Sequence, residues 1–324
     1  MKNIRNLWKS GTKTGDTTKI HCTNESDRMR VLASVVTFNP DIETLIRNLS
    51  SIYGQADSVL LVDNGSTNYD EILDVVNKDF EETKVIRNIE NIGIAAALNK
   101  ALDYASERNF GWLLTLDQDS IAEDELMKKY KNFIDNKMSH HKIAIIAPKI
   151  VDPDIKKMNK EEKDKEVIQP LSVITSGSLI NVDIAKKVGG FLNKLFIDSV
   201  DHEFCLRIKK NEYEIYKLNY CKLHHKVGNP TPHNFLGLKI YTSNHAAVRN
   251  YYIFRNDLYL SKRYLFSFPK FILRKDISLI KRLVKILLYE KEKKAKIKYS
   301  FQGIIDFIIG RYGKYEEHHK ILND

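Results

Sequence analysis

The chain has 324 residues, of which 43% are hydrophobic and 29% charged, as in an ordinary globular protein with one large core. The sequence has three widely spaced cysteines, Cys22, Cys205 and Cys221, which argue against a protein held together by disulfides. It shows no apolar secretory segment and no run of about 18 apolar residues, which argues against a membrane-spanning protein. We therefore expect a cytoplasmic protein that is soluble or peripheral. The net charge of +10 is concentrated in residues 260–324, which hold 16 Lys and Arg against 7 Asp and Glu, and such a local surface attracts nucleic acid, anionic membranes or phosphorylated substrates.

Strands and helices are predicted to alternate after a polar extension at residues 1–28, which has no hydrophobic period. Runs rich in β-branched residues predict the strands, and apolar residues at helical spacing predict the helices. In chain order these are a strand at 31–36, a helix at 42–53, a strand at 58–62, a helix at 69–79, a strand at 84–86, a helix at 94–105 and a strand at 112–116. The alternation predicts an α/β fold with helices on both faces of a mainly parallel sheet.

The second half of the chain is less regular. Strands are predicted at 143–147 and 173–180, and a charged loop at 152–166. One helix face is predicted from the spacing of Ile280, Leu283, Val284, Leu287 and Leu288, which basic residues flank. We therefore expect an α/β domain at 29–260 and a basic, amphipathic helical region at 261–324.

Three polar clusters directly follow predicted strands: Thr37-Phe38-Asn39, Asp63-Asn64-Gly65 and Asp117-Gln118-Asp119. Ligands of parallel sheets bind at the carboxyl ends of the strands, so these clusters are expected to meet at one edge. Asp117 and Asp119 are suited to a divalent cation that bridges nucleotide phosphates, although solvated acidic turns are commoner. Asp63 is suited either to its own turn or to a hydrogen bond from a nucleobase.

A second acidic group comprises Asp198, Asp201 and Glu203, which lie within six positions. Neighbouring like charges favour a raised pKa, which suits a general base. The compatible structural interpretation is a helix start, with Asp201 as the cap and Glu203 near the positive end of the helix dipole. Cys205 is predicted to be a core residue and not a nucleophile.

Two basic groups follow. His224 and His225 are suited to a metal, a phosphate or a structural role. Arg249, Arg255 and Asn256 alternate with aromatic residues, a pattern that nucleic-acid surfaces share with helix cores.

The order of these motifs resembles family 2 glycosyltransferases of the GT-A fold. The resemblance covers about residues 31 to 260 and runs through Thr37-Phe38-Asn39-Pro40, 61–66, 91–99, Asp117-Gln118-Asp119, 175–178, 189–191 and 196–207. The forms Leu-Asp-Gln-Asp-Ser and Phe-Ile-Asp-Ser-Val-Asp are most similar to the bacterial rhamnosyltransferase branch.

The resemblance implies a role for each matching residue at the donor. Asp63 would contact the base of a nucleotide-diphosphate sugar, while Thr37, Asn39 and Gly93 would shape the nucleoside pocket. Arg255 would clamp the diphosphate.

It also implies a divalent metal, Mn²⁺ or Mg²⁺, and a catalytic base. Asp119 would bind the metal with Asp117 near the donor sugar, and His225 is preferred over His224 because residues 225–228 match the family's His-x-x-Gly. Asp201 would be the base of an inverting displacement, although the family's usual Glu-Asp pair here reads Val200-Asp201.

Further residues would lie near the sugar or the acceptor: Gly177, Ser178 and Glu203.

The implied activity is transfer of rhamnose from dTDP-rhamnose to a saccharide acceptor, lipid-linked, in bacterial surface polysaccharide synthesis. A UDP-linked donor of another sugar is the alternative within the family. A nicotinamide dehydrogenase would need a Gly-x-Gly-x-x-Gly turn where Thr-Phe-Asn-Pro-Asp stands. The joint presence of Asp63, Asp119 and Asp201 argues against a non-catalytic basic module, so nucleic acid is not an expected partner. The amphipathic C-terminal stripe predicts either contact with an anionic membrane or packing on the catalytic domain.

Overall fold

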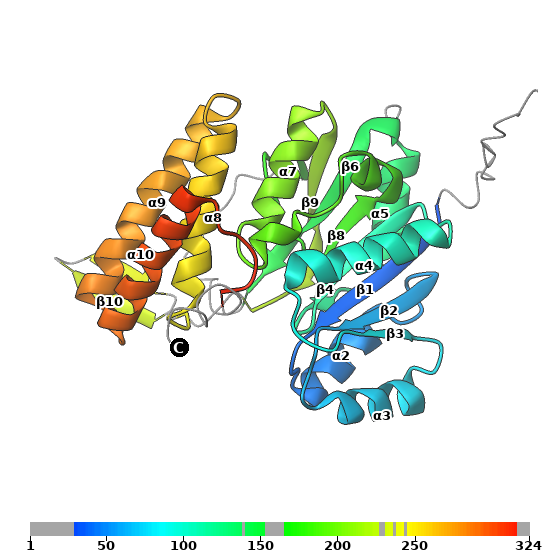
Figure 1. Cartoon of the computed structure of the whole chain (residues 1–324). Coiled ribbons are helices and arrows are strands. Elements are labelled where there is room, and N and C mark those ends of the chain that lie inside the picture. Colours follow the sequence, from blue (N-terminus) through cyan, green and yellow to red (C-terminus); the bar gives the residue numbers. More distant parts are fainter. Residues whose placement is uncertain are drawn as a thin grey trace, which may run out of the picture.

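The structure is a computed structural model that describes residues 29–137, 140–152, 165–226, 231–235, 238–242 and 245–315. The predicted extension at 1–28 and residues 153–164 of the predicted loop lie outside this part. Figure 1 shows an α/β domain on one side and a group of three long helices on the other.

One sheet of nine strands, counted over the described residues, organises the α/β domain in the order β3-β2-β1-β4-β8-β6-β9-β5, with β7 paired to β9. The first half is wholly parallel and contains β1 (Val31–Thr37), β2 (Ser58–Asp63), β3 (Lys84–Arg87) and β4 (Trp112–Asp117). This confirms the predicted mainly parallel α/β sheet.

The second half of the sheet mixes strand directions. β6 (Ile143–Val151) runs parallel to β9 (Glu214–His224), while β8 (Ser178–Asn181) runs antiparallel to β4 and β6. The short strands β5 (Ile121–Ala122) and β7 (Val167–Ile168) pair with β9. The strand predicted at 173–180 is thus shorter than expected, because Gly177, with φ of 77°, turns the chain just before β8 begins.

Helices cover both faces of the sheet, as predicted. α2 (Ile42–Ile52), α3 (Tyr69–Asp79) and α5 (Leu126–Asp135) pack on one face, and α4 (Ile94–Glu107), α6 (Val182–Lys187) and α7 (Val200–Lys210) pack on the other. Successive residues of β1 point to opposite faces, so Val31 and Ala33 join one core while Leu32 joins the other. A strand buried on both faces needs the continuous apolar run that the sequence has at this position.

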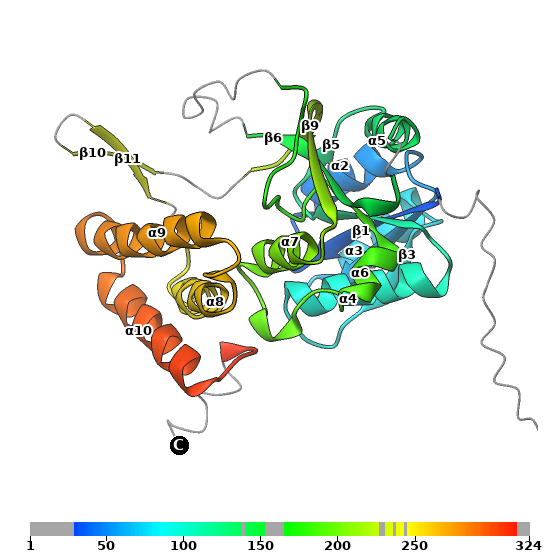
Figure 2. The same ribbon diagram turned by 90° about the horizontal axis from the view of Figure 1, so that it is seen from above.

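The helical group contains α8 (Arg249–Tyr264), α9 (Pro269–Leu288) and α10 (Lys293–Ile309). Viewed from above, α8 lies between the other two helices (Figure 2). A hairpin of β10 (Thr231–Phe235) and β11 (Leu238–Thr242) precedes α8. Within the described residues no helix is long and apolar enough to cross a membrane.

α8 also attaches this group to the α/β domain. The Asn256 side-chain amide donates hydrogen bonds to the carbonyl oxygens of Leu195 (2.9 Å), Ile197 (2.8 Å) and Asp198 (2.9 Å). α8 runs through the predicted domain boundary at residue 260. The α/β domain and the helical group are therefore joined by a packed helix and not by a linker.

Candidate active site

The carboxyl ends of three parallel strands lie side by side. In the strand register Thr37 of β1 is the partner of Asp63 at the end of β2, and Val36 is the partner of Asp117 at the end of β4. The three polar clusters that follow these strands therefore meet at one edge of the sheet, as the strand-helix alternation predicted.

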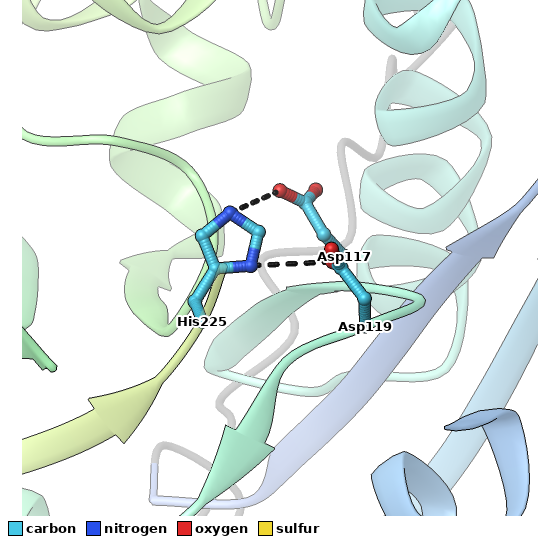
Figure 3. Close-up of side chains that lie close together, drawn as sticks. All are labelled: Asp117, Asp119 and His225. Atoms are coloured by element: carbon cyan, nitrogen blue, oxygen red, sulfur yellow. Dashed lines mark ion pairs between the residues drawn. The ribbon is translucent and has the colours of Figure 1, made fainter. Parts of the chain in front are cut away.

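Two carboxylates and one imidazole converge at this edge (Figure 3). Asp117 and Asp119 come from the end of β4 and the turn after it, and His225 comes directly after β9. His225 Nδ1 lies 3.2 Å from Asp119 Oδ1, and its Nε2 lies 3.7 Å from Asp117 Oδ2. One potential ligand atom from each of the three residues lies within 4.8 Å of the others. Two carboxylate oxygens and an imidazole nitrogen are donors that suit Mn²⁺, and the carboxylates also suit Mg²⁺.

Neighbouring polar groups hold this cluster in place. The buried Asn48 side chain of α2 donates to the Asp117 carbonyl (2.9 Å), and the Asp117 amide donates to Ser176 Oγ (3.1 Å). Ser120 Oγ lies 3.0 Å from His225 Nδ1 and 2.6 Å from Ser176 Oγ. Such outer hydrogen bonds fix ligand orientation before a metal binds.

Burial and neighbouring charges shift the pKa values of two residues of this cluster. Burial raises the pKa of Asp117, an effect that His225 opposes and that the nearby Asp119 and Asp201 reinforce. Burial alone would lower the pKa of His225, but its hydrogen bond to Asp119 and the charges of the surrounding carboxylates outweigh it and raise that pKa. Arg249 also acts on Asp117 and lowers its pKa, as His225 does.

Two cavities meet beside this cluster. The larger, of about 650 Å³, is lined by residues that include Thr37, Gly93, Asp119 and His225. The smaller, of about 400 Å³, is lined by residues that include Thr175, Asp201, His202 and Lys275. Asp117 and Arg249 line both cavities. The arrangement provides two adjoining binding spaces that share one carboxylate and one guanidinium.

Arg249 was not predicted as a site residue, and it is the arginine that faces the cavities. Its guanidinium forms a forked ion pair with Asp198, with Nε 3.1 Å from both carboxylate oxygens and Nη2 3.0 Å from Oδ1. Burial raises the pKa of Asp198, and Arg249 opposes this shift. Phe196, Asp198 and Ser199 all have positive φ, so the loop that lines both cavities holds a strained backbone. Asn256 of α8 stabilises this loop through its hydrogen bonds.

The structure does not bring Arg255, which was predicted to clamp the diphosphate, to either cavity. This side chain is fully buried. Its guanidinium donates to the carbonyl oxygens of Leu195 (3.1 Å), Lys194 (3.3 Å) and Gly313 (2.8 Å). Because its donors are used within the protein, it is a packing residue that ties α8 to the segments beside it.

Asp63 and Asn39 also bond within the protein. The fully buried Asp63 carboxylate accepts hydrogen bonds from the amides of Gly65 (3.2 Å) and Ser66 (3.1 Å). These are the bonds expected if Asp63 stabilises its own turn, the first of its two predicted roles. The Asn39 side chain accepts from the Thr67 amide at 2.7 Å. Neither lines the two cavities; Thr37, Gly93 and Asn64 line the larger one in the same region.

Gly93 has a clear physical requirement at this position. Its φ is 85°, and a Cβ atom here would lie 2.6 Å from Phe196 Cδ2 and 2.7 Å from the Phe196 carbonyl oxygen. Only glycine lets the start of α4 approach the strained loop this closely.

The three residues predicted near the acceptor do not line either cavity. Glu203 is fully buried and pairs with Arg207 (2.6 Å) and the Tyr264 hydroxyl (2.8 Å). Ser178 donates to the Ile174 carbonyl, and the Gly177 carbonyl accepts from Tyr130. The structure thus gives them packing roles.

Asp201 lies in the first turn of α7 and borders the smaller cavity. Its Oδ1 accepts a hydrogen bond from the His202 amide at 2.7 Å. The helix start is confirmed, but its N-cap is Ser199 and not Asp201 as predicted, because α7 already begins at Val200. Cys205, one turn further, is buried, and burial raises the pKa of its thiol to about 12, as suits a core residue.

Comparison with known proteins finds a family model that matches part of the chain. Residues 34–188 match the model of glycosyl transferase family 2. This match covers a little under half of the chain. The chain is 28% identical over 250 residues to dTDP-rhamnosyl transferase RfbF of Shigella flexneri, an alignment that covers 72% of this chain and 80% of that protein.

Solved structures give the same fold. TarS of S. aureus superposes with a TM-score of 0.57 at 16% identity over 86% of this chain, which spans about half (49%) of the TarS chain. TarS 1-349 in complex with UDP-GlcNAc superposes with a TM-score of 0.56, covering 86% of this chain and 80% of that one. This likeness shows the fold alone, and the predicted GT-A glycosyltransferase fold is confirmed.

Proposed function

We propose that this glycosyltransferase moves rhamnose from dTDP-rhamnose to a saccharide acceptor with inversion at the anomeric carbon, in a metal-dependent reaction. The observation that carries the proposal is the meeting of the two cavities at Asp117 and Arg249, between the Asp119–His225 cluster and Asp201. The choice of rhamnose and dTDP is drawn from the likeness to RfbF, and a UDP-linked sugar is the alternative donor.

The larger cavity would hold the donor. Thr37, Asn64 and Gly93 would border the nucleoside, and Asp119 and His225 would hold the metal beside the diphosphate. Arg249 takes the part first predicted for Arg255, because a guanidinium in contact with both cavities can bind phosphate oxygens in a forked manner. A bound divalent cation would supply Lewis-acid stabilisation of the departing nucleoside diphosphate.

The smaller cavity would hold the acceptor hydroxyl. Asp201 would accept the hydroxyl proton while the acceptor oxygen forms its bond to the anomeric carbon and the bond from that carbon to the diphosphate oxygen breaks. The leaving diphosphate keeps the electron pair, and one displacement inverts the configuration. Asp201 borders this cavity and Asp117 borders both. The proposed base would therefore lie on the acceptor side of a donor sugar bound near Asp117.

The acceptor is proposed to be a lipid-linked saccharide of bacterial surface polysaccharide synthesis, and the enzyme to act at the cytoplasmic face of a membrane. The support is the basic helical region together with the rhamnosyltransferase likeness.

The test is a thermal-shift panel of dTDP-rhamnose, dTDP and UDP-sugars, each with and without Mn²⁺ or Mg²⁺. A ligand that binds only the native state raises the unfolding temperature by mass action. We expect dTDP-rhamnose to stabilise the protein with metal and far less without it. The Asp119→Asn variant should lose this metal dependence. If only UDP-sugars raised the unfolding temperature, the donor would be a UDP-sugar and not dTDP-rhamnose. If the donor raised the unfolding temperature equally with and without metal, the proposed metal dependence would be wrong.

A further inference from the structure

α9 has apolar residues on its inner side, as an ordinary surface helix does, and a second apolar stripe on its outer side. Its inner side carries polar groups: Lys275 Nζ lies 3.0 Å from Asp257 Oδ1, and Arg282 Nε donates to Asn250 Oδ1 at 2.9 Å. Only Ile272, Leu279 and Ile286 of its apolar residues are buried. The remaining apolar stripe is turned away from the protein.

The outer face of α9 is defined by six residues spaced three or four positions apart, with one neighbour at the end: Leu273, Ile277, Ile280, Val284, Leu287 and Leu288. Their exposed fractions lie between 42% and 66%. Phe266, in the turn before α9, is 95% exposed. A contiguous apolar face of this kind marks an interaction surface, whereas single exposed apolar residues are normal. Four of the five residues of the predicted stripe, Ile280, Val284, Leu287 and Leu288, are thus exposed, and Leu283 is half-buried.

Basic side chains border the outer face. Lys270, Arg274 and Lys281 are exposed on α9. The one acidic residue of this helix, Asp276, accepts a hydrogen bond from Ser261 Oγ and so points toward α8. An apolar stripe with cations along its border is the pattern of helices that lie in the interface of an anionic bilayer. A second copy of the same face would bring no negative charge to these cations.

We propose that the outer face of α9 docks the protein on an anionic lipid bilayer. The apolar side chains enter the boundary between headgroups and acyl chains, and Lys270, Arg274 and Lys281 contact the lipid phosphates. Phe266 adds an aromatic anchor at the N-terminal end of the helix.

The docking surface is connected to the acceptor cavity by the helix itself. Lys275 lines the smaller cavity from the inner side of α9, about half a turn around the helix from Leu273 and Ile277. A bilayer on the outer side therefore lies one helix diameter, about 10 Å, from the space proposed for the acceptor. This consequence rests on the proposed function, whereas lipid binding itself needs neither donor nor metal.

Co-sedimentation of the full chain with lipid vesicles tests the docking surface. We expect binding to vesicles of phosphatidylcholine mixed with phosphatidylglycerol and much weaker binding to phosphatidylcholine alone. The double variant Ile280→Asp, Val284→Asp should lower the partition coefficient at least about tenfold, since two apolar side chains no longer enter the bilayer. The double variant Lys270→Glu, Arg274→Glu should lower it roughly tenfold on the anionic vesicles only.

The matched control is Ile89→Asp, which replaces a fully exposed isoleucine of the α/β domain and should bind vesicles like the wild type. Unchanged unfolding temperatures would show that the α9 variants fold, as expected because their buried residues are intact. Equal binding by the α9 variants and the wild type, or no binding by the wild type, would overturn the proposal. Self-association that the α9 variants abolish, without vesicle binding, would overturn it in favour of a second copy. The thermal shift with donor and metal, measured on the same samples, reports separately on the proposed function.

Discussion

Two arginines of α8 that lie six positions apart have opposite environments. Residues six apart on a helix are separated by about 240° around its axis, so they cannot face the same cavity. Arg249 lines both cavities, and Arg255 is fully buried among carbonyl oxygens. Sequence comparison of motifs does not distinguish them, because both precede an asparagine in an aromatic-rich segment.

The two environments predict different consequences for the same substitution. Arg249→Lys keeps a positive charge but loses the forked geometry, so we expect the KM for the donor to rise about tenfold with little change in the unfolding temperature. Arg255→Lys leaves several buried carbonyl oxygens unpaired and should lower the free energy of unfolding by about 3 kcal/mol. Steady-state kinetics and urea unfolding of both variants measure the two effects. If only Arg255→Lys changed the KM for the donor, Arg255 and not Arg249 would be the residue that contacts the diphosphate.

Asp201 can be tested as the base without removing its place in the helix. Asp201→Asn keeps the side-chain volume and the acceptor oxygen for the His202 amide, but it cannot take a proton. General-base catalysis contributes about 100- to 10,000-fold, so kcat should fall at least about 100-fold while donor binding by thermal shift is retained. Asp183→Asn, at the exposed start of α6, is the matched control and should keep the wild-type kcat. A near wild-type rate for Asp201→Asn would exclude it as the base.

The two described cysteines are predicted to be unreactive in the folded protein. Burial raises the pKa of both Cys205 and Cys221 to about 12, so at pH 8 only about 1 in 10,000 of either thiol is the reactive thiolate. Alkylation at pH 8 followed by peptide mass spectrometry should find neither modified, and both modified after unfolding in urea. Rapid labelling of native Cys205 would mean that this part of α7 opens, against its assignment to the core.

At the scale of elements, residues 31–116 follow their sequence pattern closely and the later strands do not. β1, β2 and β4 are apolar runs buried on both faces, and such a run has one structural solution in a sheet. No strand was predicted for β9, although it has eleven residues. Its pairing with β6 contains two register shifts, and such irregularities interrupt the alternation that a sequence pattern can detect.

The contact between α8 and α10 depends on one glycine. A Cβ atom at Gly303 would lie 2.4 Å from the Tyr251 carbonyl oxygen and 3.2 Å from the Arg255 amide nitrogen. Gly303→Ala should therefore push the helices apart and lower the free energy of unfolding by about 2–3 kcal/mol in urea. Gly310→Asn is the control, because open space surrounds Gly310 and asparagine tolerates its φ of 76°, so the change should stay below about 1 kcal/mol. Equal effects of the two variants would contradict the close helix contact.

At the scale of the whole molecule, the sequence indicated the fold and the sheet edge that carries the site, but not how side chains divide between site and packing. Asp117, Asp119, His225 and Asp201 border the cavities because strand ends and helix starts are positions that pattern and motif both specify. The Asp63 carboxylate accepts hydrogen bonds from the amides of its own turn. An Asp-Asn-Gly-Ser turn has the same sequence whether or not its carboxylate also contacts a ligand, so the sequence could not decide between the two roles. The orientation of α9 was undecidable because an amphipathic stripe is equally compatible with a protein core and with a bilayer.

The attachment of α8 to both parts predicts how the molecule unfolds. Asn256 and Arg255 bond to carbonyl oxygens of the segment 194–198, and residues 196–198 of that segment line the cavities, so melting the helices would release the site as well. We therefore expect a single calorimetric transition in which the van't Hoff and calorimetric enthalpies agree. Asn256→Ala removes three hydrogen bonds to this segment and should split or broaden the transition, with the helical group melting first. Two transitions already in the wild type would mean that the helices are an independent unit, and that the segment 194–198 does not depend on α8.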